Sequence, residues 1–148
     1  MGSTGVATTL ALASGVAGSI QIAALGALGQ RIGELEAAAF AFALTALAGF
    51  LLLLVARRGV DAYTDALSAP AWMWLGGLTG VLIVISVVVA GPRIGVLATS
   101  ALLITGQLVA ATAIDRFGWL GVPQVTIAWQ RIAGLALLVA GTALILRR

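Results

Sequence analysis

The chain has 148 residues, of which 61% are hydrophobic and only 9% are charged. Soluble domains are about 45–50% apolar and about 25% charged, and a soluble chain of this length leaves roughly a third of its surface exposed to water. The composition therefore excludes a water-soluble protein and indicates an integral membrane protein.

The residue types that are missing exclude several kinds of chemistry. The chain contains no Cys and no His, so zinc sites, cysteine nucleophiles and histidine acid–base relays are excluded. All eight basic residues are Arg, and they occur singly or in pairs without the basic run that marks nucleic-acid binding. We expect no enzymatic activity, no metal, no cofactor and no nucleic-acid partner.

Apolar stretches near the ~20 residues that cross ~30 Å of hydrocarbon recur along the chain. They are Val6–Leu28, Ala37–Val55, Trp72–Ala90, Ile94–Ile114 and Ala128–Leu146. Their length fits helices and not the ~10-residue alternation of membrane β-barrels. The sequence predicts an all-α integral membrane protein with five transmembrane helices in one domain, residues 1–148.

The first stretch could be misread as a secretory signal, because Ala11-Leu12-Ala13 resembles a cleavage site. No Lys or Arg precedes Arg31, so the basic n-region of a signal is missing. We therefore expect this stretch to remain as a transmembrane helix.

The predicted connections differ in length. Those at Gly29–Glu36 and Gly91–Arg93 are short, whereas Arg57–Ala71 and Asp115–Ile127 are longer. Within the first long connection, apolar residues at helical spacing fit either a short interfacial helix or a solvated loop; they are Val60, Tyr63, Ala66 and Leu67.

Arginine placement predicts orientation, because cytoplasmic loops carry an excess of Lys and Arg. With five helices, four arginines fall on the side of the N-terminus and four on the side of the C-terminus. The first set is Arg57, Arg58, Arg116 and Arg131, and the second is Arg31, Arg93, Arg147 and Arg148. This balance fits either insertion in both orientations, giving an antiparallel dimer, or a topology set by a partner or by the first helix.

The tryptophans favour the antiparallel arrangement. All four lie on the side of the N-terminus: Trp72, Trp74, Trp119 and Trp129. Aromatic belts normally occupy both faces of a membrane, and an inverted second copy would supply the missing belt.

Polar residues inside the spans are the candidate working residues. Gln21 and Gln107 are the only amides well inside the hydrocarbon, where an unpartnered amide costs several kcal/mol. Each must therefore make an interhelical hydrogen bond or line a solute pathway. Hydroxyls join this predicted pathway at Ser14, Ser86 and Ser100, although back-bonding to the preceding helical turn is the alternative.

Small residues predict close helix packing or a dimer contact. The candidates are Gly15, Gly18, Gly76 and Gly80. The acidic residues near the spans, Glu34, Glu36 and Asp115, lie at predicted helix ends. Either proton coupling is therefore absent, or one of these carboxylates lies deeper in the membrane than the predicted spans indicate.

Several segments resemble a known family: Trp72–Gly80, Pro92–Gly95, Gly106–Leu108 and Asp115–Gly118. They are similar to the YdcZ-like branch of the drug/metabolite transporter superfamily, which consists of small five-helix proteins of the bacterial inner membrane. The chain departs from that pattern at Leu25, where the family typically has Asn, and at Phe42, where it usually has Ser.

The resemblance implies half of a ten-helix inverted-repeat transporter, because larger superfamily members contain two inverted five-helix repeats. Gln21 and Gln107 match family positions and are expected at the central cavity. Together with the arginine balance, the resemblance implies a dual-topology antiparallel homodimer that moves a small organic solute across the bacterial inner membrane by alternating access. The alternatives are a dual-topology channel and a non-transporting accessory or half subunit of a membrane complex.

Overall fold

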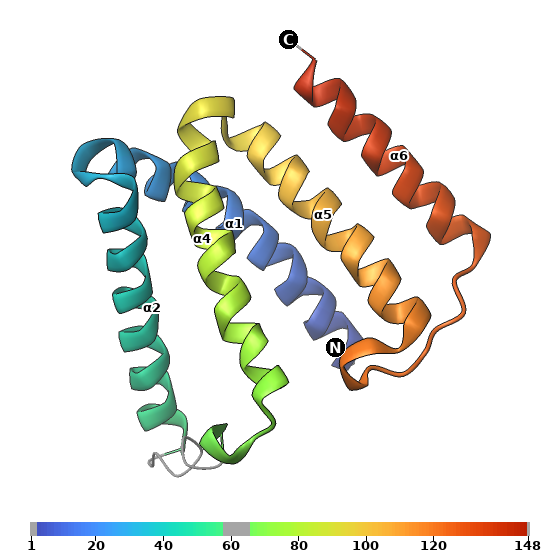
Figure 1. Cartoon of the computed structure of the whole chain (residues 1–148), viewed down its shortest axis with the longest axis horizontal. Helices are drawn as coiled ribbons and strands as arrows, with labels where there is room; N and C mark the ends of the chain where they lie inside the picture. Colours follow the sequence, from blue (N-terminus) through green and yellow to red (C-terminus); the bar gives the residue numbers. More distant parts are fainter. Residues whose placement is uncertain (1–2, 58–65, 148) are drawn as a thin grey trace. The chain divides into compact units, whose positions relative to one another are not determined.

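The computed structural model describes residues 3–57 and 66–147. Its long helices are α1 (Ser3–Ile32), α2 (Glu34–Arg57), α4 (Leu75–Ile94), α5 (Val96–Phe117) and α6 (Trp129–Leu146) (Figure 1). Short 3₁₀ turns, η1 (Ala71–Trp74) and η2 (Trp119–Gly121), precede α4 and follow α5. All five long helices are apolar and long enough to cross a bilayer, which confirms the predicted number and type of spans.

The α1–α2 connection is shorter than the sequence indicated, because α1 continues to Ile32 and α2 begins at Glu34. Gly33 alone interrupts the helices, with a φ of 107°. Its N–H donates to the carbonyl of Gly29 at 2.9 Å, and its own carbonyl accepts from the N–H of Ala37 at 3.0 Å. A residue with a Cβ rarely adopts this φ, so glycine permits the change of direction with little loss of hydrogen bonding.

The α4–α5 connection is also reduced to one glycine. Pro92 lies inside the last turn of α4, and the helix ends only at Ile94. Gly95 then takes a φ of 85° and begins α5. The predicted turn at Gly91–Arg93 is therefore helical, and the interruption between the two helices falls at Gly95.

The predicted interfacial helix lies largely outside the described residues, which resume at Ala66. Residues 66–68 are helical, and the indole Nε1–H of Trp74 donates to the carbonyl of Ala66 at 3.3 Å. This bond ties the end of the connection to η1.

The chain forms two compact units, one of residues 23–92 and one of residues 1–22 and 93–148. In the first, Ala37 and Ala38 of α2 pack with Val88 of α4, which is fully buried. Partly buried side chains surround them: Leu25, Leu28, Phe42, Val84 and Ile85. In the second, α5 and α6 pack against each other and a loop joins them.

Large apolar side chains face outward along the helices. Leu52 is 69% exposed, Leu97 69% and Leu137 74%. In water this surface would be strongly unfavourable, whereas lipid tails solvate it. The outward apolar faces therefore agree with the membrane assignment.

Gly29 controls packing in the unit of residues 23–92. A Cβ at this position would lie 2.6 Å from Cγ1 of Val88, and the β-branched, buried valine has little freedom to move. We expect Gly29→Ala to lower the free energy of unfolding by about 1–3 kcal/mol, the usual cost of overpacking a core. Reversible unfolding in mixed detergent micelles measures this change.

Gly49→Ala is the matched control, because a Cβ on Gly49 meets no described atom within 4 Å. It should leave stability unchanged or raise it slightly through helix propensity. Equal stability of the two variants would contradict the packing described for Gly29.

Candidate functional site

Gln21 on α1 and Gln107 on α5 are both exposed. Among residues 3–57 and 66–147, neither carboxamide makes a hydrogen bond. Both belong to the unit of residues 1–22 and 93–148 and lie inside helices of membrane-spanning length. An amide without a partner in hydrocarbon costs about 4–8 kcal/mol on a cyclohexane scale, so each needs a polar partner that the described part of one chain does not supply.

The predicted pathway hydroxyls divide into two kinds. Ser14 donates to the carbonyl of Ala11 at 2.8 Å, and Ser86 donates to the carbonyl of Leu82 at 2.7 Å. Both bonds follow the back-bonding alternative. The Oγ of Ser100 is buried and has no hydrogen-bond partner within the described residues, so Ser100 alone retains an unused hydroxyl.

The five predicted pathway residues are not joined into one network. Across the described helices, no hydrogen bond links any two of them. Ser86 belongs to the unit of residues 23–92, and the other four belong to the second unit. One chain therefore presents these groups separately.

Sequence reasoning missed a hydroxyl pair between α5 and α6. The Oγ1 atoms of Thr105 and Thr142 lie 2.7 Å apart, and Thr142 is 5% exposed. In hydrocarbon such a pair satisfies two hydroxyls at once. Nothing in the sequence marks the pair, because residues 37 apart give no local signal.

The glycines predicted for packing are open. A Cβ built on Gly15, Gly18, Gly76 or Gly80 meets no described atom within 4 Å. The close contacts instead involve Gly29 with Val88, and Gly26, where a Cβ would lie 3.1 Å from Cδ of Pro92. Within the described residues, these four glycines therefore have no close packing partner.

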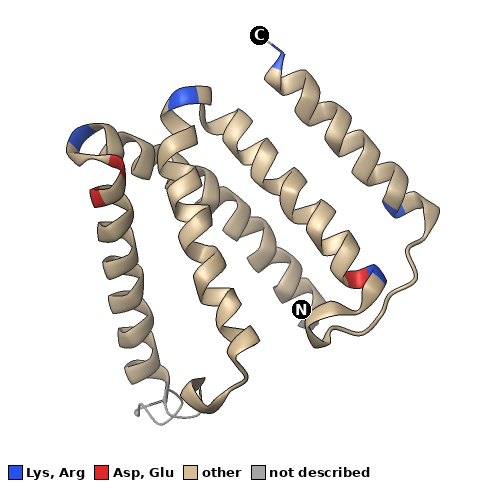
Figure 2. Cartoon of the chain, in the orientation of Figure 1, with Lys and Arg blue, Asp and Glu red and all other residues tan. Residues whose placement is uncertain are grey.

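The charges lie at helix ends and not within the spans (Figure 2). Asp115, in the last turn of α5, lies 3.9 Å from Arg131, and its side chain is 38% exposed. Glu34 and Glu36 occupy the first turn of α2, where the helix N-terminus favours negative charge. Among the described residues, no group of three acidic side chains could hold a metal ion.

Comparison with known protein families identifies the family of this chain. Residues 6–144 match the family model described as "Putative inner membrane exporter, YdcZ". The chain belongs to this family. Its members are exporters rather than enzymes, and the chain is accordingly a multi-pass protein of the inner membrane. No curated protein matches the chain, and no solved structure matches it.

The hydroxyl pair of this YdcZ-family exporter is open to a direct test. We expect Thr105→Val and Thr142→Val each to destabilise the protein, since each leaves the other hydroxyl unpaired. The double variant should lose less than the sum, with a coupling of about 0.6–1.7 kcal/mol, the average and maximum for such bonds in membranes. A double-mutant cycle of unfolding free energies in micelles measures the coupling, and strict additivity would contradict the pair.

Proposed function

We propose that this exporter works as an antiparallel homodimer of ten helices that moves a small organic solute by alternating access. One copy is inserted with its N-terminus on one side of the membrane, and the other copy is inverted. A two-fold axis in the membrane plane relates the two copies. Inverted repeats of this kind place transporter sites near the bilayer midplane.

The main observation in support of the proposal is that two carboxamides, those of Gln21 and Gln107, lack hydrogen-bond partners in the part of the chain that the structure describes. Gln21 and Gln107 are exposed on membrane-spanning helices and lack partners within the described chain. Lipid tails cannot hydrogen-bond with them. A cavity between two copies would give all four carboxamides water, solute or each other as partners.

The distribution of arginine supports the dimer. With four arginines on each side of the membrane, the positive-inside rule favours neither orientation. At the end of α5 and the start of α6 lie Arg116 and Arg131, and Arg147 follows the other end of α6. A population of both orientations is therefore available for pairing.

The remaining polar and small residues have supporting roles in this proposal. The free hydroxyl of Ser100 adds a hydrogen-bonding group, whereas Ser14 and Ser86 shape the path while bonded to their own helices. The open glycines, Gly15, Gly18, Gly76 and Gly80, are the proposed contacts with the second copy.

The charge of the proposed site favours a neutral, polar solute. The candidate residues within the spans are amides, hydroxyls and glycines, and none carries a charge. A strongly cationic solute would find no carboxylate among them. Hydrogen bonds from the carboxamides suit a small solute with both donors and acceptors.

The experiment uses purified protein reconstituted in vesicles and a panel of small neutral polar solutes. A solute that the unaltered protein transports saturably is then tested with Gln21→Ala and Gln107→Ala. We expect each variant to weaken solute binding about tenfold, because a lost hydrogen bond costs about 0.5–1.5 kcal/mol and each of the two copies loses one. Dimer assembly, measured by cross-linking, should persist.

Gln30→Ala is the matched control, since Gln30 is an exposed amide on the same helix as Gln21 but close to its end. It should leave binding unchanged. Unchanged binding in both Gln21→Ala and Gln107→Ala would refute the assignment of the site. Flux that rises linearly with solute concentration would favour a channel over a carrier.

A further inference from the structure

The segment after α5 folds back onto the end of that helix. Gly118, with a φ of 65°, donates its N–H to the carbonyl of Ile114 at 2.8 Å. The N–H of Val125 donates to the carbonyl of Asp115 at 2.9 Å, and Nε2 of Gln124 donates to the carbonyl of Phe117 at 3.3 Å. Three carbonyls that a helix end normally leaves unsatisfied therefore have donors from the same segment.

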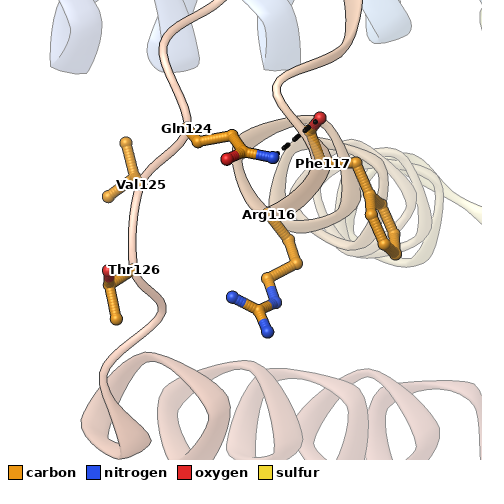
Figure 3. A pocket seen from close by; sticks show the side chains of 5 residues that line it. All are labelled: Arg116, Phe117, Gln124, Val125 and Thr126. Atoms are coloured by element: carbon orange, nitrogen blue, oxygen red, sulfur yellow. Dashed lines mark hydrogen bonds between the residues drawn. The ribbon is translucent and has the colours of Figure 1, made fainter.

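A partly open pocket of about 430 Å³ lies between this segment and the end of α5. Its lining residues are Arg116, Phe117, Gln124, Val125 and Thr126. Figure 3 shows the Arg116 side chain extending into the space between the end of α5 and the loop segment that carries Thr126. The Thr126 side chain points away from Arg116 in this view, so the pocket presents a cationic side chain without a facing hydroxyl.

The charged group of the pocket is available to a ligand. Within the described part of the chain, Arg116 makes no ion pair or hydrogen bond, and the hydroxyl of Thr126 makes no hydrogen bond. The nearby carboxylate of Asp115 is paired with Arg131 at 3.9 Å. Within residues 3–57 and 66–147, the positive charge of Arg116 is consequently not neutralised by a partner of its own.

Aromatic residues place the pocket at the membrane surface. Trp119 immediately follows α5 and is 56% exposed, and Trp129 begins α6 and is 71% exposed. The ring of Trp119 stacks on Phe117 with the centroids 5.1 Å apart. Exposed tryptophans of membrane proteins lie at the depth of the lipid headgroups, so the pocket lies at the depth where lipid phosphates are found.

We propose that this pocket binds an anionic phosphate group. The guanidinium of Arg116 can donate two parallel hydrogen bonds to phosphate oxygens, the arrangement in which arginine binds phosphate best. Basic pockets at the ends of membrane helices bind the headgroups of anionic lipids in this way, and a phosphate-bearing solute offers the same chemistry. The site is separate from the proposed solute path and does not depend on it.

The test counts bound phosphatidylglycerol by native mass spectrometry of the full-length protein released from detergent micelles, with phosphatidylcholine as the neutral comparison. We expect preferential binding of phosphatidylglycerol. Arg116→Gln should weaken it about tenfold or more, because hydrogen bonds to charged groups are worth more than neutral ones. Thr126→Val should leave binding unchanged, because this side chain points away from Arg116.

Arg147→Gln is the control, since it removes the same charge after the other end of α6, outside the pocket. It should bind as the unaltered protein does. Equal losses in Arg116→Gln and Arg147→Gln would overturn the proposal and indicate diffuse electrostatic attraction. The absence of any preferential phosphatidylglycerol binding would also overturn it. Unchanged helicity of the variants by circular dichroism separates lost binding from misfolding.

Soluble glycerol phosphate distinguishes the two sources of the phosphate. If it displaces phosphatidylglycerol at millimolar concentration, and Arg116→Gln abolishes this competition, the site accepts free phosphate-bearing solutes. If only the lipid binds, in an Arg116-dependent manner, the occupant is a headgroup. Each of these two results supports the phosphate site. If neither phosphatidylglycerol nor glycerol phosphate binds, the site is refuted.

Discussion

The hydrocarbon of a bilayer offers no hydrogen bonds, and this constraint accounts for most of the structure. The backbone meets it by forming five long helices whose N–H and C=O groups are paired within each helix. Most hydroxyls in those helices meet it by bonding to their own preceding turn, as Ser14 and Ser86 do. Thr105 and Thr142 meet it by bonding to each other. Gln21, Gln107 and Ser100 are exceptions, because within the described chain their side chains have no hydrogen-bond partner, and we propose that they face the solute path.

Glycine has two structural roles in this chain: it adopts positive φ between helices, and it allows close packing. At Gly33 and Gly95, positive φ values let one helix end and the next begin with a single residue between them. At Gly29, the missing side chain makes room for Val88 in the buried core of one unit. Gly15, Gly18, Gly76 and Gly80 serve neither purpose in the described residues, which is why we propose them as contacts with a second copy.

The number of spans could be predicted from the sequence because hydrocarbon thickness sets the length of apolar runs. The helix ends could not, because polar and charged residues such as Arg31 and Glu34 can continue a helix beyond the hydrocarbon. Pro92 indicated a turn but lies within α4, since Gly95 three residues later is the residue with a positive φ.

Only part of the candidate site could be predicted from the sequence. Gln21 and Gln107 could be selected because amides are rare and costly in hydrocarbon. The structure then left them without partners in the described chain. The Thr105–Thr142 pair and the pocket beside Arg116 depend on residues brought together by the α5–α6 connection. No spacing in the sequence encodes those contacts.

The central claim is that one chain is half of a working transporter and that its two copies have opposite orientations. Because the chain contains no cysteine, one Cys added after Arg148 reports orientation without interference. Intact cells are labelled with a membrane-impermeant maleimide, and the labelling is repeated after permeabilisation. The account predicts that roughly half of the molecules react from outside, as the arginine balance implies for an equal mixture of orientations. Labelling of all molecules or of none in intact cells would contradict it.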